Sequence, residues 1–296
     1  MSESPAEPTV DCKPVVLVGI VTRNRAGVLP KAIHSALSQS YANVDVAVLD
    51  DGSEDGTSSL RLEFPAVQWL RWDSARGYLE ARNQLMRTTE ADYYLSLDDD
   101  AWFVDKDEIT VAIEHLETNP RVGAVAFEIL SPDRPKPAVR SAARPVHMFI
   151  GCGHIVRMSA VRETGFYAPS PGLYGSEEKD LCLRLLDGHW EVHLMPGVHV
   201  WHDKTTLARE LDAQHRSGVC NDLVFALRRC PVPLVLGVLP LKLARHLRFS
   251  IGNHLLRSCL AGFGLFLRHA FSVWRRREPV RPATFLEFVR RSREGS

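Results

Sequence analysis

The chain has 296 residues, of which 45% are hydrophobic, and it carries 36 basic and 36 acidic side chains. This length suits one large domain or one domain with an appendage, and the apolar content can build a sizeable core. The six cysteines form no CxxC pair, and no window reaches the ~18 apolar residues that span a bilayer. The sequence therefore excludes a disulfide framework, a cysteine zinc site and a transmembrane helix.

Charge is divided unevenly along the chain. From Arg228 to the end there are 14 Lys and Arg against three Asp and Glu, whereas the preceding part has 22 against 33. An acidic body with a tail of net charge +11 predicts that the tail meets something anionic.

Strand and helix patterns alternate through the first hundred residues. Residues 1–13 are acidic and rich in proline, which predicts a disordered leader rather than a signal peptide and, with the scattered cysteines, a cytoplasmic location. Apolar runs then predict strands, and amphipathic patterns predict helices, at residues 15–21 (strand), 28–39 (helix), 44–49 (strand), 67–72 (strand), 77–87 (helix) and 93–97 (strand). The first run is apolar on both faces, as in a central parallel strand.

Three of these strands finish in polar, turn-forming residues: Thr22, then Asp50 and Asp51, then the triplet of residues 98–100. Chemistry at the carboxyl ends of alternating strands is typical of a doubly wound α/β fold, in which ligands bind at that edge. The fold class predicted here is therefore α/β, with a mostly parallel sheet and flanking helices.

Weaker elements follow. The patterns predict a helix at 106–118, a strand at 122–130, a Pro- and Arg-rich loop at 131–145, a short helix at 181–186 and an alternating strand at 190–200. From about residue 218, leucines and arginines at helical spacing predict one or two basic amphipathic helices. The expected division is a catalytic domain at 14–217 and a helical region at 218–296.

The triplet Asp98-Asp99-Asp100 directly follows a buried strand. Like charges a few Å apart repel by roughly 4 kcal/mol per pair, so three carboxylates at one spot require a cation or shifted pKa values. Hard cations such as Mg²⁺ or Mn²⁺ take carboxylate oxygens and leave positions for substrate phosphates. We expect Asp98 and Asp100 to be the ligand pair and Asp99 to flank them.

Several other polar positions have both a structural and a functional interpretation. Asp50 and Asp51 could contact a nucleobase or ribose, or could cap a turn. Thr22 could face the same pocket, and Arg82, one helical turn past Gly77, could reach a diphosphate or lie on a solvated face.

A second set lies later in the chain. Glu177 and Glu178 begin a helix, where carboxylates stabilise the positive end of the dipole or where one could act as a general base. His202 ends a strand and could complete a metal shell or simply pack in the core. Gly151 and Gly153 flank Cys152 and would let the backbone approach a ligand closely.

The order of these features resembles the family-two glycosyltransferases of GT-A fold, from residue 15 to residue 202. Val21-Thr22-Arg23-Asn24-Arg25 looks like the first-strand nucleotide motif. Val48-Leu49-Asp50-Asp51-Gly52-Ser53 resembles the base and ribose motif, with Asp51 as the base contact. Arg76-Gly77-Tyr78-Leu79-Glu80-Ala81-Arg82-Asn83 resembles the segment near the diphosphate.

The remaining motifs concern the metal and the base. Leu97-Asp98-Asp99-Asp100 is similar to the DxD metal motif, which implies Asp98 and Asp100 as ligands. The run 177–184, Glu-Glu-Lys-Asp-Leu-Cys-Leu-Arg, resembles a Glu-Asp-x-Asp-Leu-x-Leu-Arg motif whose base falls on Glu178; because Glu replaces Asp there, Glu177 stays a candidate. Val200-Trp201-His202 looks like the segment whose histidine joins the metal in several members.

The resemblance implies an inverting, metal-dependent transfer of a hexosyl or deoxyhexosyl group from a nucleoside-diphosphate sugar to an acceptor hydroxyl. The implied donor-binding residues are Thr22, Arg23, Asn24, Asp50, Asp51, Gly77, Arg82, Asp98 and Asp99, and the implied acceptor-side residues are Gly151, Cys152, Gly153 and Trp201. The acceptor is left open between a lipid-linked sugar and a small metabolite. Two other functions remain: a nucleotidyltransferase that makes the nucleotide sugar, and a non-catalytic membrane scaffold.

Three roles are open for the basic tail. It could lie on an anionic membrane surface at the inner face, pack on the acidic body, or form a homodimer contact. No nucleic-acid partner is expected.

Overall fold

A computed structural model describes residues 13–135, 142–203 and 211–294. Residues 1–12 of the predicted leader and residues 136–141 of the predicted loop lie outside the described part.

Four parallel strands form the first half of the sheet, as predicted. They are β1 (Val16–Thr22), β2 (Val44–Asp50), β3 (Gln68–Arg71) and β4 (Tyr93–Asp98). β1 lies between β2 and β4, which explains why its run is apolar on both faces. Thr22 pairs in register with Asp50, and Val21 pairs with Asp98, so the three polar strand ends reach the same edge.

The second half of the sheet is mixed. It is built from β5 (Ala101–Phe103), β6 (Val122–Leu130), β7 (Arg144–Pro145), β8 (Gly153–Arg157) and β9 (Glu191–His202). The strand order is β3-β2-β1-β4-β8-β6-β9-β5, with β7 paired to β9. β6 and β9 are parallel, whereas β8 runs antiparallel to β4 and to β6, and β5 and β7 run antiparallel to β9, so the predicted α/β sheet is mixed in this half. The strands β5, β7 and β8 are short and carry no clear alternation, and the sequence did not predict them.

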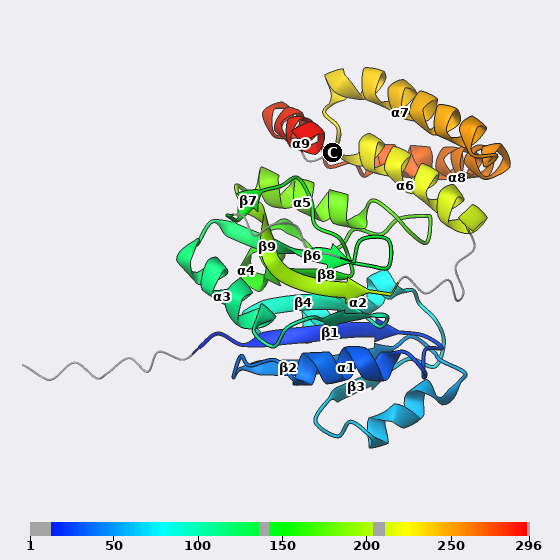
Figure 1. Ribbon diagram of the computed structural model, residues 1–296. Coiled ribbons are helices and arrows are strands. Elements are labelled where there is room, and N and C mark those ends of the chain that lie inside the picture. The colour runs from blue at the N-terminus through cyan, green and yellow to red at the C-terminus, as the bar shows by residue number, and fades with distance from the viewer. Residues whose placement is uncertain (1–12, 136–141, 204–210, 295–296) are drawn as a thin grey trace, which may run out of the picture.

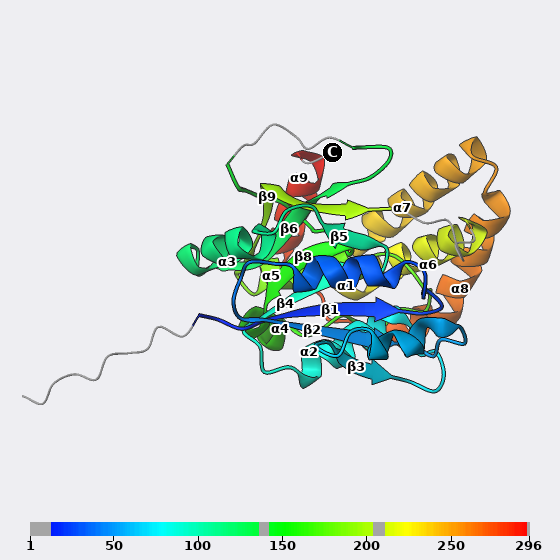
Figure 2. The same cartoon turned by 60° about the horizontal axis from the view of Figure 1, so that its bottom comes forward.

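Helices cover both faces of the sheet (Figures 1 and 2). One core joins α1 (Leu29–Leu37) and α3 (Glu108–Thr118) to the sheet, and the short 3₁₀ helix η1 (Gly56–Leu62) adds Leu60 to it. The other face packs against α2 (Tyr78–Thr88), α4 (Met158–Thr164) and α5 (Glu177–Asp187). α5 begins at the acidic run itself, four residues before the predicted helix.

Four helices form the end of the described chain: α6 (Leu211–Arg229), α7 (Val232–Gly252), α8 (Leu256–Arg275) and α9 (Pro282–Glu294). They gather beside α5, at the opposite end of the molecule from β3 (Figure 1). One or two helices were predicted, and the predicted domain division at 217/218 falls inside α6. The core on the α5 face continues into this group through Val219, Leu223 and Phe266, which are buried.

Ion pairs between α5 and α6, one of them buried, fix the tail to the body. Asp180 on α5 accepts from Arg184 Nε at 2.8 Å and from Arg229 Nε, on α6, at 2.7 Å. Lys179 and Lys242 both donate to Asp222 at 2.8 Å. The alternative in which the basic helices pack on the acidic body is therefore realised. Among the described helices, none is both long and apolar enough to cross a membrane.

Candidate active site

A cleft of about 730 Å³ opens where β1, β2 and β4 end. Its walls come from strand ends, the loop before β8, the start of α5 and one side of α6. The lining residues are Val21, Thr22, Arg23, Asn24, Arg25, Asp51, Tyr78, Arg82, Asp98, Asp99, Ile150, Gly151, Cys152, Tyr174, Gly175, Glu177, Glu178, His202, Gln214 and Gly218. Most of the residues predicted for donor and base roles are therefore brought to one cavity.

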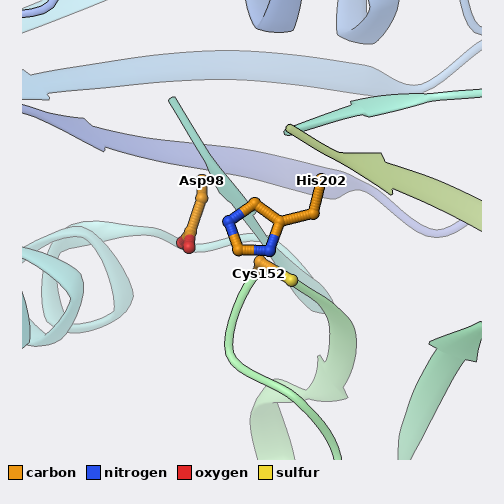
Figure 3. Close-up of side chains that lie close together, drawn as sticks. All are labelled: Asp98, Cys152 and His202. Carbon is orange, nitrogen blue, oxygen red and sulfur yellow. The ribbon is translucent and has the colours of Figure 1, made fainter. Parts of the chain in front are cut away.

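Three side chains converge at the acidic corner of this cleft. Asp98 at the end of β4, Cys152 in the loop before β8 and His202 at the end of β9 point toward one another (Figure 3). One ligand atom from each lies within 4.8 Å of the others. Burial and the nearby Asp98 carboxylate raise the pKa of the Cys152 thiol, so in the absence of a metal it is protonated at neutral pH.

Asp100 lies behind this corner and does not line the cleft. It is 1% exposed, and its Oδ1 is 3.1 Å from His202 Nε2. His202 Nε2 is buried and makes no hydrogen bond. A buried nitrogen with no hydrogen bond, close to the carboxylates of Asp98 and Asp100, fits a divalent cation, and the available donors are the oxygen and imidazole ligands that Mg²⁺ or Mn²⁺ accept.

Arg82 holds Asp98 in place. Its Nη2 donates to Asp98 Oδ1 at 2.5 Å and to the Gly151 carbonyl oxygen at 3.3 Å, and the residue is 6% exposed. Arg82 was predicted to contact a diphosphate directly or to lie on a solvated face. The buried guanidinium excludes the solvated interpretation.

Asp99 is held by a hydrogen bond from the neighbouring strand, β1. The Thr22 hydroxyl donates to Asp99 Oδ2 at 2.8 Å. Burial raises the pKa of Asp99 to about 7, although Arg25 and the Thr22 hydrogen bond act in the opposite direction. Strand β1 therefore contributes to the acidic corner of the cleft.

The two aspartates after β2 have different surroundings. Asp51 reaches the cleft, but its carboxylate already accepts from the backbone N–H of Arg76 at 2.6 Å and of Gly77 at 2.9 Å. Asp50 does not line the cleft: its Oδ1 accepts from Ser53 N at 2.8 Å, the turn-capping alternative. Gly77 also lies outside the lining; it is the residue immediately before α2 and has φ +98°, a conformation that favours glycine.

The two glutamates at the start of α5 are not equivalent. The Tyr78 hydroxyl donates to Glu177 Oε1. Burial and the adjacent Glu177 charge raise the pKa of Glu178 to about 7, against the opposing effect of Arg82. A Cβ placed on Gly151 would lie 2.3 Å from Glu178 Oε1, so this glycine leaves room for that carboxylate.

Two residues expected on the acceptor side lie elsewhere. Gly153 begins β8, where an added Cβ would meet Ile129 and Val200, so close packing explains the glycine. Trp201 stacks on Trp102 with ring centroids 6.1 Å apart, across the β5–β9 pair. Neither is among the residues that line the cleft.

Other lining residues were not predicted. Tyr78 stacks on Tyr174 at 5.5 Å, and together they form an aromatic wall beside Glu177. Tyr78 precedes Arg82 by one helical turn, a spacing that the sequence does display. Gln214 and Gly218 come from α6, and no local pattern connects that helix with the strand ends.

Comparisons with known proteins agree with this geometry. The model of the family described as "Glycosyl transferase family 2" matches residues 17–165. A glucosyltransferase of Escherichia coli, "UDP-Glc:alpha-D-GlcNAc-diphosphoundecaprenol beta-1,3-glucosyltransferase WfgD", is 32% identical over 102 residues, which are 33% of this chain and 40% of that protein. The chain spans two fifths or less of the length of the curated relatives that it matches.

Solved structures show the same fold. The mannosyltransferase PcManGT from Pyrobaculum calidifontis, solved with GDP-Man and Mn²⁺, superposes with a TM-score of 0.60 at 16% identity, covering 86% of this chain and 75% of that one. TarS residues 1–349 from S. aureus superpose with a TM-score of 0.61 at 13% identity, covering 95% and 92%. The predicted GT-A fold is thus confirmed.

Proposed function

The chain belongs to glycosyl transferase family 2, and we propose that its cleft binds a nucleoside-diphosphate sugar and transfers the sugar, with inversion, to an acceptor hydroxyl. One observation carries the proposal: a carboxylate–imidazole corner, Asp98 with His202, shares a single cavity with the carboxylate of Glu178. The Asp98–His202 corner suits a diphosphate bound through a metal, and the Glu178 carboxylate suits removal of a proton from an acceptor hydroxyl. The family of the chain and its glycosyltransferase class agree with the predictions from sequence.

Asp98, Asp100 and His202 would hold the divalent cation, Mg²⁺ or Mn²⁺. When bound, the cation would neutralise negative charge on the leaving diphosphate. The structure of PcManGT with Mn²⁺ supports this assignment. Arg82 positions Asp98, because its guanidinium is buried between that carboxylate and the Gly151 carbonyl.

Glu178 is the proposed general base. Glu178 lines the cleft and its pKa is raised to about 7, whereas one oxygen of Glu177 already accepts a hydrogen bond from Tyr78, so Glu178 is the better placed to accept the proton of an acceptor hydroxyl. The acceptor oxygen then forms a bond to the anomeric carbon while the bond from that carbon to the diphosphate oxygen breaks. The proton passes to Glu178 and later to water, and the electron pair leaves with the diphosphate. A base with a pKa near the working pH is the most effective one.

A donor screen tests this function. Thermal unfolding is measured with UDP-, GDP- and dTDP-sugars, each with and without Mn²⁺, and release of the nucleoside diphosphate is then followed for any donor that stabilises the protein. We expect stabilisation by one nucleotide class only when Mn²⁺ is present. Equal stabilisation of the Asp98→Asn variant would count against the proposed site.

We further propose that α8 brings this cleft to an anionic membrane surface. The outer side of α8 carries an apolar stripe in which every member is at least 41% exposed: Leu256, Leu260, Leu267, Phe271 and Trp274. Spacings of four, seven, four and three residues place them along one side of a helix. The other side of α8 is buried through Cys259, Phe266 and Val273.

The positive charges beside the apolar stripe of α8 support an anionic lipid surface as its binding partner. Arg257, Arg268 and Arg275 each directly follow a member of the stripe and are exposed, and α8 contains no acidic residue. An amphipathic helix with arginines along its apolar edge is attracted to anionic headgroups. The name of WfgD specifies a diphosphoundecaprenol acceptor, which supports a lipid-linked acceptor for this chain.

Vesicle co-sedimentation of the full chain tests the membrane proposal. Binding is expected to vesicles of phosphatidylcholine with phosphatidylglycerol and not to phosphatidylcholine alone. The double variant Leu267→Glu/Phe271→Glu should lose it, whereas Leu62→Glu, at a leucine that is 80% exposed on η1, should keep it. Failure of the wild type to bind, or a homodimer that dissociates in the double variant, would assign the stripe to another partner.

A further inference from the structure

A second group of metal-ligand side chains lies outside the cleft. Asp105 precedes α3, Glu108 is its first residue, and His199 lies on β9, three residues before His202. One ligand atom from each of Asp105, Glu108 and His199 lies within 4.8 Å of the others. None of these three residues lines the cleft.

One buried carboxylate oxygen of this group lacks the hydrogen bond that burial requires. Glu108 is 1% exposed and its Oε1 makes no hydrogen bond, although buried carboxylate oxygens are normally paired. His199 is 7% exposed, and its Nδ1 is 3.7 Å from that oxygen, beyond hydrogen-bond distance. The Glu108 carboxylate and the His199 imidazole thus face each other without forming a hydrogen bond.

The other side of the imidazole faces a third carboxylate. His199 Nε2 is 3.5 Å from Glu128 Oε2, and Arg134 donates to the other oxygen of Glu128 at 3.1 Å. A metal-bound histidine almost always directs its second ring N–H at a carboxylate or carbonyl, which fixes its tautomer. Glu128 lies beside His199 Nε2, the position of such an orienting partner.

We propose that Asp105, Glu108 and His199 Nδ1 bind a divalent zinc ion, with Glu128 orienting the imidazole. One imidazole nitrogen and two carboxylate oxygens are ligands that Zn²⁺ takes, and Asp105, which is exposed, leaves a fourth position open to water. Among first-row divalent ions, such a set binds zinc more tightly than manganese. The ligands, two carboxylates and one imidazole, are of the same types as Asp98, Asp100 and His202 at the cleft corner, so zinc binding at this site has to be measured with the cleft corner disabled.

The zinc site has a structural consequence for the cleft. Val104 N, next to Asp105, donates to the His199 carbonyl at 3.3 Å, and Phe103 pairs with Val200 in the β5–β9 ladder. A metal at this point fastens the start of α3 to β9, the strand that ends at His202. Zinc would thus stabilise the strand that carries a cleft residue without itself touching the donor.

Zinc titration of the untagged full chain tests this inference independently of any sugar transfer. The cleft cluster is first disabled with Asp98→Asn/His202→Ala, and the protein is stripped with EDTA and dialysed. In this background we expect uptake of one equivalent of Zn²⁺ by isothermal titration calorimetry, with a rise in the thermal midpoint. Absence of binding in the disabled background would overturn the site.

Matched variants locate the site. Asp105→Asn removes an exposed ligand without disturbing the core and is expected to weaken Zn²⁺ binding at least tenfold. Asp107→Asn changes an exposed aspartate two residues away and should leave binding unchanged. Glu108→Gln is compared in the same way with Glu114→Gln, an exposed glutamate on the same helix. Equal zinc affinity in Asp105→Asn and Asp107→Asn would place the metal elsewhere and contradict the proposal.

Discussion

The assignment of Glu178 as the base predicts a specific pH dependence. Burial and the Glu177 charge raise the pKa of Glu178 to about 7. A general base must be ionised, and a carboxyl group of this pKa is ionised in about one tenth of molecules at pH 6 and about nine tenths at pH 8. kcat/KM is therefore expected to rise about tenfold over this interval and then to level off.

Substitution tests the same reasoning. Glu178→Gln keeps the shape of the side chain but removes the proton acceptor, so turnover should fall by ~10²–10⁴, or about 3–5 kcal/mol of activation free energy, and the pH slope should disappear. Glu177→Gln removes a neighbouring negative charge, which lowers the pKa of Glu178 and shifts the profile to lower pH while most of the activity remains. Release of nucleoside diphosphate is measured from pH 5.5 to 8.5. A Glu178→Gln enzyme with the wild-type rate and slope would refute the assignment, and loss of turnover in Glu177→Gln would transfer the role to that residue.

Two further predictions concern packing. In Gly151→Ala the new Cβ would lie 2.3 Å from Glu178 Oε1, so we expect displacement of this base to lower kcat about tenfold or more. The control is Gly237→Ala, in which the added Cβ has nothing within 4 Å. Equal kcat values for the two variants would contradict the close approach of Gly151 to Glu178. Asp180→Asn weakens a buried carboxylate that pairs with two arginines and should cost about 3–5 kcal/mol of the free energy of unfolding. Glu287→Gln, in an exposed pairing with two arginines, should cost about 1 kcal/mol or less, and similar denaturation midpoints for the two variants would show that burial adds nothing.

The first half of the fold could be predicted because its signals are local. Continuous apolar runs ending in Thr22 and in Asp98 identify buried parallel strands, and the parallel pairing of β1 with β2 and β4 brings their ends together. The same logic predicted the acidic corner. Residue types alone did not distinguish Asp50 from Asp51, because a turn directs neighbouring side chains to different places, and only the family resemblance favoured Asp51.

The features of the fold and the site that could not be predicted depend on contacts between segments distant in the sequence. His202 approaches Asp98 through the pairing of β5 with β9, and β5 has only three residues, too few for a periodic signal. Asp180 looked like part of an acidic helix start, yet its partner Arg229 lies 49 residues away. The role of α6 in lining the cleft is likewise a consequence of packing, since hydrophobic periodicity indicates which side of a helix is buried but not what covers it.

Metal-dependent turnover of a nucleotide sugar tests the central claim most directly. The donor found in the thermal screen is incubated with the full chain in Mn²⁺, in excess EDTA and with the Asp98→Asn variant, and free nucleoside diphosphate is quantified. We expect release in Mn²⁺, loss in EDTA with recovery when Mn²⁺ is restored, and a strongly reduced rate in the variant. Equal release in all three samples would contradict a cation site at the end of β4.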